Sequence, residues 1–323
     1  MRILVTGASG FIGNALIPML EARGHEVHKM LRYVSGGRYD SYERNPLSHF
    51  ADLRDRETVR LVVKEVKPEV IIHLAAEAAV SYSFRNPIDV LETNFMGTVN
   101  LGEAAREQGI EHYILASSSE VYGKAEVFPV AEDTILRGTS PYAVSKIAAE
   151  HYLWLLWDLY RFPVTVLRPF NSYGRALVGN RHYVVERAIT QALTEGHIHL
   201  HDPRPARDFL FREDHARAYV HVVENREKAL GQAINIGTGQ SWTIAEMADA
   251  VASRARLYRD GPVGVSFSEV SDRPLDIPCL QGSNARAREL LGWEPKWGFE
   301  EGLYKAIHEW ADYLKIPFKG GTC

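Results

Sequence analysis

The stretch RILVTGASGFIG, residues 2–13, decides the fold of this 323-residue chain. A strand rich in β-branched residues runs into a turn with the glycine spacing GxxGxxG, and the apolar residues of a helix follow. The first glycine of such a turn permits a tight bend, the second lets the backbone approach a pyrophosphate, and the third lets the helix pack against the strand. The start of the helix favours phosphate through its free N–H groups and its dipole. A plain strand–helix turn is the alternative. The residues that we expect to bind a dinucleotide here are Gly7, Gly10, Phe11, Ile12 and Gly13.

The rest of the first half continues this alternation of strands and helices. Further strand-like runs, each separated from the next by a helical pattern or a loop, cover residues 25–32, 69–76, 112–119 and 164–174. Such spacing predicts βαβ units and an α/β fold with a doubly wound parallel sheet of the Rossmann type. We expect a dinucleotide-binding domain over residues 1–172, rejoined by a strand near residues 232–237. Residues 173–323 should mainly form a smaller C-terminal lobe, which supplies the other wall of a cleft.

Composition excludes several classes of protein. The chain is 46% hydrophobic and 24% charged, and its formal charge of −4 does not suggest a nucleic-acid partner. It has no apolar run of about eighteen residues, so we expect no membrane span. The two cysteines, Cys279 and Cys323, form neither a disulfide framework nor part of a zinc-binding cluster, so no metal is expected. A reducing, cytoplasmic setting is the default.

Small or polar residues follow several of the predicted strands, in VTGASG, HLAAEA, LASSSE and RPFNSYG. Ligands of doubly wound sheets bind beyond the carboxyl ends of the strands, so these segments should meet at one cleft. We expect the segment after the run at 69–76 to contact the cofactor through Leu74, Ala75 and Ala76.

The end of the second strand indicates which dinucleotide is bound. An acidic residue there usually binds the ribose hydroxyls, but this chain has Leu31 and Arg32. Because an arginine can accommodate a 2′-phosphate, the sequence favours NADP, with NAD possible and a solvated Arg32 as the alternative. Asp52 and Leu53 follow the third strand and are expected near the adenine, although Asp52 could instead cap a helix.

Tyr142 and Lys146 lie four residues apart in SPYAVSK, and therefore on one face of a helix. The helix follows the segment ASSSEVYG, so both side chains can face the same cleft. A neighbouring ammonium and an oxidised nicotinamide ring would both favour the phenolate of Tyr142, which could then act as a base toward a hydroxyl. Without that context, an exposed tyrosine above a solvated lysine would be the simpler interpretation.

In this order, TGASGFIG, HLAA, SSSEVYG, PYAVSK and RPFNSYG resemble the extended short-chain dehydrogenases/reductases, and more narrowly the nucleotide-sugar epimerases and dehydratases. The resemblance covers nearly the whole chain. It implies that Ser118, Tyr142 and Lys146 form the catalytic set, with Lys146 also binding the nicotinamide ribose. It also implies a nucleotide-diphosphate sugar as substrate.

The residue type at the position of Glu120 differs between the epimerases and the dehydratases of this family. Where the epimerases generally carry a neutral residue, the sugar 4,6-dehydratases carry a glutamate. Ser119, which precedes it, looks more like GDP-mannose dehydratases than glucose-type dehydratases, which have an aspartate there. The resemblance thus implies that Glu120 removes the C5 proton during loss of water, giving a 4-keto-6-deoxy sugar. The alternative is that Glu120 only orders its loop by accepting backbone N–H bonds.

The resemblance also implies a set of substrate-binding residues. HLAAEAAVSYSF resembles the dehydratase loop after the fourth strand, ARDF and DRPLD match diphosphate positions, and RPFN matches a residue that bonds phosphate or sugar. Each of these side chains could instead have a structural role. The residues in question are Glu77, Ser81, Ser119, Asn171, Arg207 and Arg273.

Three other functions remain open at this point. Two are enzymatic, a nucleotide-sugar 4-epimerase and a decarboxylase of a nucleotide-linked glucuronate, and the third is a non-catalytic NADP-binding regulator. HYLWLLWDLY, residues 151–160, is apolar on more than one helix face. Together with the helix near residues 87–108 it could form a four-helix homodimer interface, as in the family, or it could be fully buried in one subunit.

Overall fold

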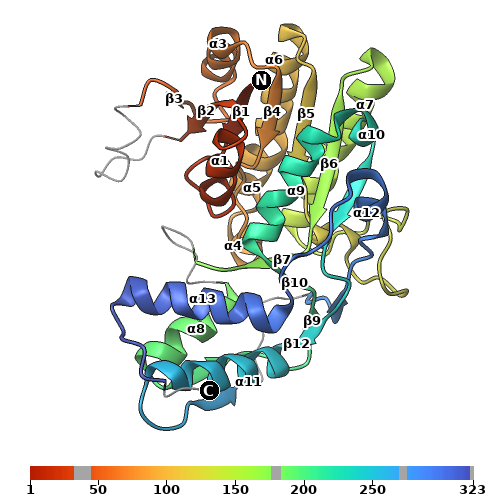
Figure 1. Ribbon diagram of the computed structural model, residues 1–323. Coiled ribbons are helices and arrows are strands. Elements are labelled where there is room, and N and C mark those ends of the chain that lie inside the picture. Colours follow the sequence, from red (N-terminus) through yellow and green to blue (C-terminus); the bar gives the residue numbers. More distant parts are fainter. Residues whose placement is uncertain (33–44, 176–182, 269–274, 321–323) are drawn as a thin grey trace.

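The computed structural model describes residues 1–32, 45–175, 183–268 and 275–320, and its centre is a seven-stranded parallel sheet (Figure 1). The strand order is β11-β6-β5-β4-β1-β2-β3. The strands are added outward from β1, first toward one edge of the sheet and then toward the other, which confirms the predicted doubly wound α/β fold. Every neighbouring pair is parallel. The strands are β1 (Arg2–Thr6), β2 (Glu26–Leu31), β3 (Ser48–Phe50), β4 (Val70–His73), β5 (His112–Ala116), β6 (Val164–Pro169) and β11 (Ala233–Ile236).

Two apolar layers cover the sheet, one on each face. On one face a core that includes Leu16, Leu20, Tyr219, Val223 and Leu291 joins the sheet to α1, α9 and α12. On the other face a second core joins it to α3, α6 and α7. Figure 1 shows α1 and α9 lying together against the sheet. The helices are α1 (Gly13–Glu21), α3 (Arg56–Val66), α6 (Gly97–Gln108), α7 (Pro141–Tyr160), α9 (Arg212–Glu224), α10 (Arg226–Ala229) and α12 (Ala285–Leu291).

The helix expected near residues 87–108 is not a regular α-helix throughout. It begins as α5 (Pro87–Leu91), passes through a π-helical segment η1 (Glu92–Met96) and continues as α6 to Gly109, whose φ is 70°. Such π segments often occur at functional sites. The short helix α4 (Val80–Arg85) precedes it.

A smaller group of helices and strands lies beyond the carboxyl ends of the sheet. Its core, which includes Ile189, Met247, Val251, Leu303 and Trp310, joins three helices, and Figure 1 shows them as a layer below the sheet. These helices are α8 (Val184–Thr194), α11 (Ile244–Ala255) and α13 (Phe299–Leu314), and the short strands are β7 (Asn171–Tyr173), β8 (His197–Leu200), β9 (Ala206–Arg207), β10 (Phe209–Phe211), β12 (Trp242–Thr243), β13 (Gly264–Phe267) and β14 (Cys279–Leu280). Two short 3-10 helices, η2 (Ser119–Tyr122) and η3 (Arg256–Tyr258), complete the elements.

The division of the chain near residue 172 stays a prediction. β11, α9 and α12 all come from the later half of the sequence, yet they complete the sheet or cover it. Among the described residues, no helix is long and apolar enough to cross a membrane.

Candidate active site

The turn between β1 and α1 has no room for side chains. A Cβ on Gly13 would lie 2.6 Å from the carbonyl oxygens of Gly7 and Ala8, and one on Gly10 would lie 2.9 Å from that of Gly7. Gly7 itself has a φ of 68°, and a Cβ there would lie 2.8 Å from the backbone nitrogen of Ala75. Because these three positions carry no side chain and lie at the start of a helix, a pyrophosphate could approach their backbone closely. The geometry therefore fits the dinucleotide predicted from the sequence.

The end of β4 lies directly beside this turn. The backbone nitrogen of Ala75 donates to Thr6 Oγ1 at 3.1 Å, and Thr6 Oγ1 also lies 2.7 Å from His73 Nδ1. Leu74, Ala75 and Ala76 are half-buried, as are Phe11 and Ile12 across the turn. The structure thus brings together these two groups of residues predicted to bind the cofactor.

The residues predicted around the adenosine half of the cofactor follow β2 and β3, at the same carboxyl edge of the sheet as the glycine turn. Arg32 is exposed and directly follows that strand. Asp52 forms a two-pronged ion pair with Arg54, with 2.6 Å between Oδ2 and Nη2, and the Arg54 guanidinium holds the pKa of Asp52 below its usual range. The proposal that Asp52 caps a helix is wrong, because Asp55 caps α3 by accepting from the backbone nitrogen of Thr58. Leu53 is buried against Gly97.

Ser118 and Glu120 follow β5 in a short 3-10 turn. Ser118 caps η2, with its Oγ accepting from the backbone nitrogen of Glu120 at 3.2 Å. Ser118, Ser119 and Glu120 are all buried, and Glu120 is only 7% exposed. A carboxylate at this depth is uncommon without a specific reason, since burying a charge is costly. The run of hydroxyls is therefore a packed part of the site rather than a surface loop.

Tyr142 and Lys146 face this segment from the first turns of α7. Burial raises the pKa of Tyr142, a hydrogen bond with Ser118 opposes that rise, and the nearby charge of Glu120 adds to it. Burial lowers the pKa of Lys146 to about 8, and its Nζ donates to the Ala116 carbonyl at 2.7 Å. The structure thus brings Ser118, Glu120, Tyr142 and Lys146 together. That an ammonium at Lys146 favours the phenolate of Tyr142 stays a prediction.

Asn94 is a buried polar residue that the sequence reasoning missed. It lies in the π-helical segment η1, where its Oδ1 accepts from the backbone nitrogen of Glu77 at 2.8 Å and its Nδ2 donates to the Glu77 carbonyl at 3.0 Å. The same Nδ2 donates to Ser145 Oγ on α7 at 3.0 Å. Asn94 thus fixes the predicted sugar-site residue Glu77 to the catalytic helix. An asparagine within an apolar helical run was the available signal.

The remaining predicted substrate residues are more scattered. Ser81 lies in α4, and Asn171 begins β7, where its Oδ1 is buried and has no partner among the described residues. Arg207 is 4% exposed, with Nη2 2.9 Å from Asp276 Oδ1 and Nη1 2.7 Å from the Ile277 carbonyl. Arg273 lies outside the described residues. Asp276, three residues further along the chain, forms an ion pair with Arg207.

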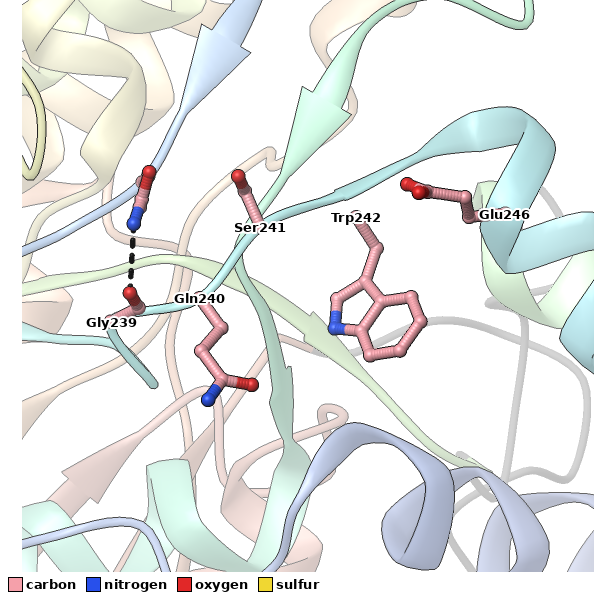
Figure 2. A pocket seen from close by; sticks show the side chains of 6 residues that line it. Gly239, Gln240, Ser241, Trp242 and Glu246 are labelled. Atoms are coloured by element: carbon pink, nitrogen blue, oxygen red, sulfur yellow. Dashed lines mark hydrogen bonds between the residues drawn. The ribbon is translucent and has the colours of Figure 1, made fainter.

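A pocket of about 410 Å³ opens at the turn between β11 and β12 (Figure 2). Trp242, in β12, pairs directly with Arg207 in β9, so the two side chains lie on one face of that small sheet. Figure 2 shows the Trp242 indole with Gln240 on the same side of the chain and Ser241 on the other. The sequence analysis did not identify this pocket, although NIGTGQSWT has the signature of a turn. The residues that line it are Gly239, Gln240, Ser241, Trp242, Glu246 and Gln281.

Asp208 holds the loop that leads into this pocket. Its two oxygens accept from the backbone nitrogen of Thr238 at 2.8 Å, from Thr238 Oγ1 at 2.6 Å, from the backbone nitrogen of Gly239 at 3.0 Å and from that of Gly282 at 3.3 Å. Burial raises the pKa of Asp208 to about 6 despite these four donors. One carboxyl group thus joins the loop after β11 to the backbone at Gly282, and Gln281 and Asn284 add bonds to the carbonyls of Gly239 and Gly237.

Comparison with known proteins shows the family to which this chain belongs. The family model described as GDP-mannose 4,6 dehydratase matches residues 4–306. A UDP-glucose 4-epimerase of Mycolicibacterium smegmatis is 36% identical over 318 residues, which cover 95% of this chain and 97% of the relative. A dTDP-glucose 4,6-dehydratase of Neisseria gonorrhoeae is 31% identical over 339 residues, which cover 96% of each chain.

Among solved structures, the UDP-glucose 4-epimerase of Thermus thermophilus in complex with NAD is similar, with a TM-score of 0.82 and 32% identity. The match covers 95% of this chain and 98% of that one. Because such relatives include both dehydratases and epimerases, the levels of identity do not separate the two activities. The expected enzyme class and the resemblance read from the sequence are confirmed, and the chain belongs to the GDP-mannose 4,6-dehydratase family of extended short-chain dehydrogenases/reductases.

Proposed function

We propose that the protein is a nucleotide-sugar 4,6-dehydratase that uses a bound nicotinamide dinucleotide. One observation carries the proposal: Glu120 is buried one residue beyond Ser119 and close enough to Tyr142 for its charge to act on the phenol. A 4-epimerase needs a base for one hydroxyl only, which Tyr142 supplies. A buried carboxylate beside that phenol suits a reaction that also removes a carbon-bound proton.

The chain's own residues can carry the proton transfers of this reaction. Tyr142 takes the proton of the sugar 4-hydroxyl, and Ser118 holds that oxygen through its side chain. Glu120 removes the C5 proton, which the C4 ketone has made acidic, and passes it to the C6 hydroxyl, which leaves as water. When bound, the nicotinamide ring would accept hydride from C4 and return it to C6. C5 then takes up one proton, which balances the proton that Tyr142 removed from the 4-hydroxyl. The overall change is therefore the loss of one water.

Glu120→Gln tests this assignment directly. The variant keeps the shape and hydrogen-bonding capacity of the side chain but lacks the base, so loss of water should fall by roughly 10²- to 10⁴-fold while sugar and cofactor still bind. The measurement is mass detection of water loss from a panel of UDP-, GDP-, dTDP- and CDP-sugars. Glu126→Gln, an exposed position nearby, is the matched control. Product at the parent rate from Glu120→Gln would rule out the role.

A nucleotide-sugar 4-epimerase is the second candidate, because a relative that is 36% identical bears that name. The same panel separates the two activities. An epimerase gives an isomer of unchanged mass, whereas a dehydratase gives a 4-keto product lighter by one water.

We also propose that the cofactor is NADP rather than NAD. The support is the end of β2, where the exposed Arg32 stands in the place usually taken by a carboxylate. Arg32→Ser should weaken NADP binding by roughly tenfold, because one arginine–phosphate interaction is lost, and leave NAD binding nearly unchanged. Tighter binding of NAD than of NADP by the parent protein would contradict the proposal.

We further propose a cytoplasmic homodimer that pairs α5–η1–α6 and α7 with their copies. An exposed apolar stripe on α7 is formed by Val144, Leu155 and Leu159, and Ile88 and Met96 are exposed on the neighbouring α5–η1 segment. Light scattering after size exclusion should give a dimer for the parent and a monomer for Leu159→Lys. Leu61→Lys, at an exposed leucine on α3, is the control. A parent monomer at micromolar concentration would rule out the dimer.

A further inference from the structure

A buried ion pair lies behind the active site. The Arg168 Nη2 is 2.7 Å from Glu150 Oε2, and Arg168 Nε lies 3.1 and 3.2 Å from the two carboxylate oxygens. Glu150 is 0% exposed and Arg168 is 4% exposed. Replacing such a pair by apolar residues is often neutral or stabilising, so its presence is weak evidence of a role in stability. The position of the pair in the fold suggests a different role.

The pair is bonded to both ends of the segment that carries Ser118 and Glu120. At one end, Ser117 Oγ donates to Glu150 Oε1. At the other end, Arg168 Nη1 donates to the Tyr122 hydroxyl at 2.9 Å, and that hydroxyl donates to Asn235 Oδ1 on β11 at 2.6 Å. The four residues between Ser117 and Tyr122 are thus held at both ends, because Ser117 is bonded to Glu150 and Tyr122 is bonded to Arg168.

The same carboxylate acts on the catalytic lysine. Glu150 lies one helical turn after Lys146 on α7, and its negative charge opposes the lowering of the Lys146 pKa by burial. In the part of the chain that the structure describes, other titratable or charged groups near Lys146 include Tyr142 one turn earlier on α7, His73 on β4 and, through Glu150, Arg168 on β6. Burial lowers the pKa of His73 to about 3, so that ring is neutral at working pH.

We propose that Glu150 and Arg168 are positioning residues, which hold Ser118 and Glu120 at Tyr142 and keep Lys146 charged. The part that concerns Glu120 rests on the proposed dehydratase function, whereas the part that concerns Lys146 applies to any hydride transfer at this site. The two parts call for different variants.

Glu150→Gln tests the effect on Lys146. Gln can still accept from Ser117, but without the charge the Lys146 ammonium becomes easier to deprotonate. The alkaline limb of hydride transfer, followed by nicotinamide absorbance, should therefore move to lower pH by about one unit. A purely structural role would lower the rate at every pH without moving the limb. Glu57→Gln, in an exposed pair with Arg60, is the control. An unmoved limb in a folded Glu150→Gln variant would overturn this part of the proposal.

Tyr122→Phe tests the positioning of Glu120 and keeps the ion pair. It removes the bonds to Arg168 and Asn235 at the far end of the segment, so loss of water should fall by roughly tenfold to 100-fold. Oxidation at C4 and the KM of the sugar should change much less. An unchanged ratio of elimination to oxidation would overturn this part, and Tyr122→Phe decides that part even if Glu150→Gln does not fold. If the parent never releases water, the proposed function has failed, while the pH test of Glu150→Gln still stands.

Discussion

Two buried carboxylates hold the two segments that we propose as the walls of the active-site cleft, and they do so by different means. Glu150 faces the guanidinium of Arg168 and holds the segment after β5. Asp208 faces four neutral donors and holds the loop after β11. The first arrangement is a rigid pair of charges with directed bonds at two separate points. The second is a single group whose pKa burial raises to about 6. The wall that carries the chemistry and the wall next to the pocket should therefore respond differently to mutation and to pH.

Tyr142→Phe should have the largest effect on activity, and it should affect the segment with the proposed catalytic residues but not the segment beside the pocket. Loss of the hydroxyl that bonds Ser118 removes the base, so kcat should fall by roughly 10²- to 10⁴-fold. Binding of the nucleotide sugar, followed by calorimetry, should change little, because the other wall is intact. A loss of binding as large as the loss of rate would show that the two walls are not separable.

Arg207→Ala should instead weaken the binding of the nucleotide sugar and leave the catalytic rate nearly unchanged. We expect KM for the nucleotide sugar to rise by roughly tenfold or more with kcat nearly unchanged, because a guanidinium that contacts the diphosphate acts equally in ground and transition states. Steady-state kinetics measures both constants. Arg204→Ala, at an exposed side chain three residues away, is the control. A fall in kcat alone would place Arg207 with the catalytic residues instead.

The smallest effect should be the pH dependence that Asp208 gives to folding. Its pKa is raised from 3.8 to about 6, so the stabilising contribution of the neutral form is complete below pH 3.8 and is lost as the pH rises through about 6. The total change is at most about 3 kcal/mol. Asp208→Asn should remove this fall in the free energy of unfolding.

Urea unfolding at about pH 4 and about pH 7 would measure this change. Asp249→Asn, at an exposed position on α11, should keep the parent's pH dependence. An equal pH dependence in the Asp208→Asn variant and the parent would mean that Asp208 is charged throughout this range.

The sequence predicted the sheet, the glycine turn and the proximity of Ser118, Glu120, Tyr142 and Lys146 because each rests on a local pattern. Gly10 and Gly13 are required by backbone contacts a few residues away, and Tyr142 and Lys146 share a helix face by their spacing alone. The residues that were missed depend on tertiary contacts. Glu150 lies in AAEHYL, where nothing distinguishes a buried glutamate from a solvated one, and its partner Arg168 comes from another strand.

Choices between neighbouring residues were also beyond the sequence. Asp52 and Asp55 both precede α3, and only the backbone geometry makes Asp55 the cap. Arg207 was singled out as a diphosphate-binding residue, which stays a prediction, and its bonds to Asp276 and Ile277 could not be predicted because these residues lie about seventy positions further along the chain. The pocket beside Trp242 needs β9, β12 and β14 together, and these strands are only two residues long.

The place of β11 at the edge of the sheet has a consequence for biosynthesis. A nascent chain that has emerged through residue 172 contains six of the seven strands, but the free edge of β6 has not yet met β11. The sheet face that α9 and α12 later cover is then covered by α1 alone, so part of its apolar surface stays exposed. Unpaired edges and exposed apolar faces make such intermediates prone to aggregate. The ribosome must therefore release most of the polypeptide before the sheet is closed, and a fragment ending at residue 172 should need a chaperone to stay in solution.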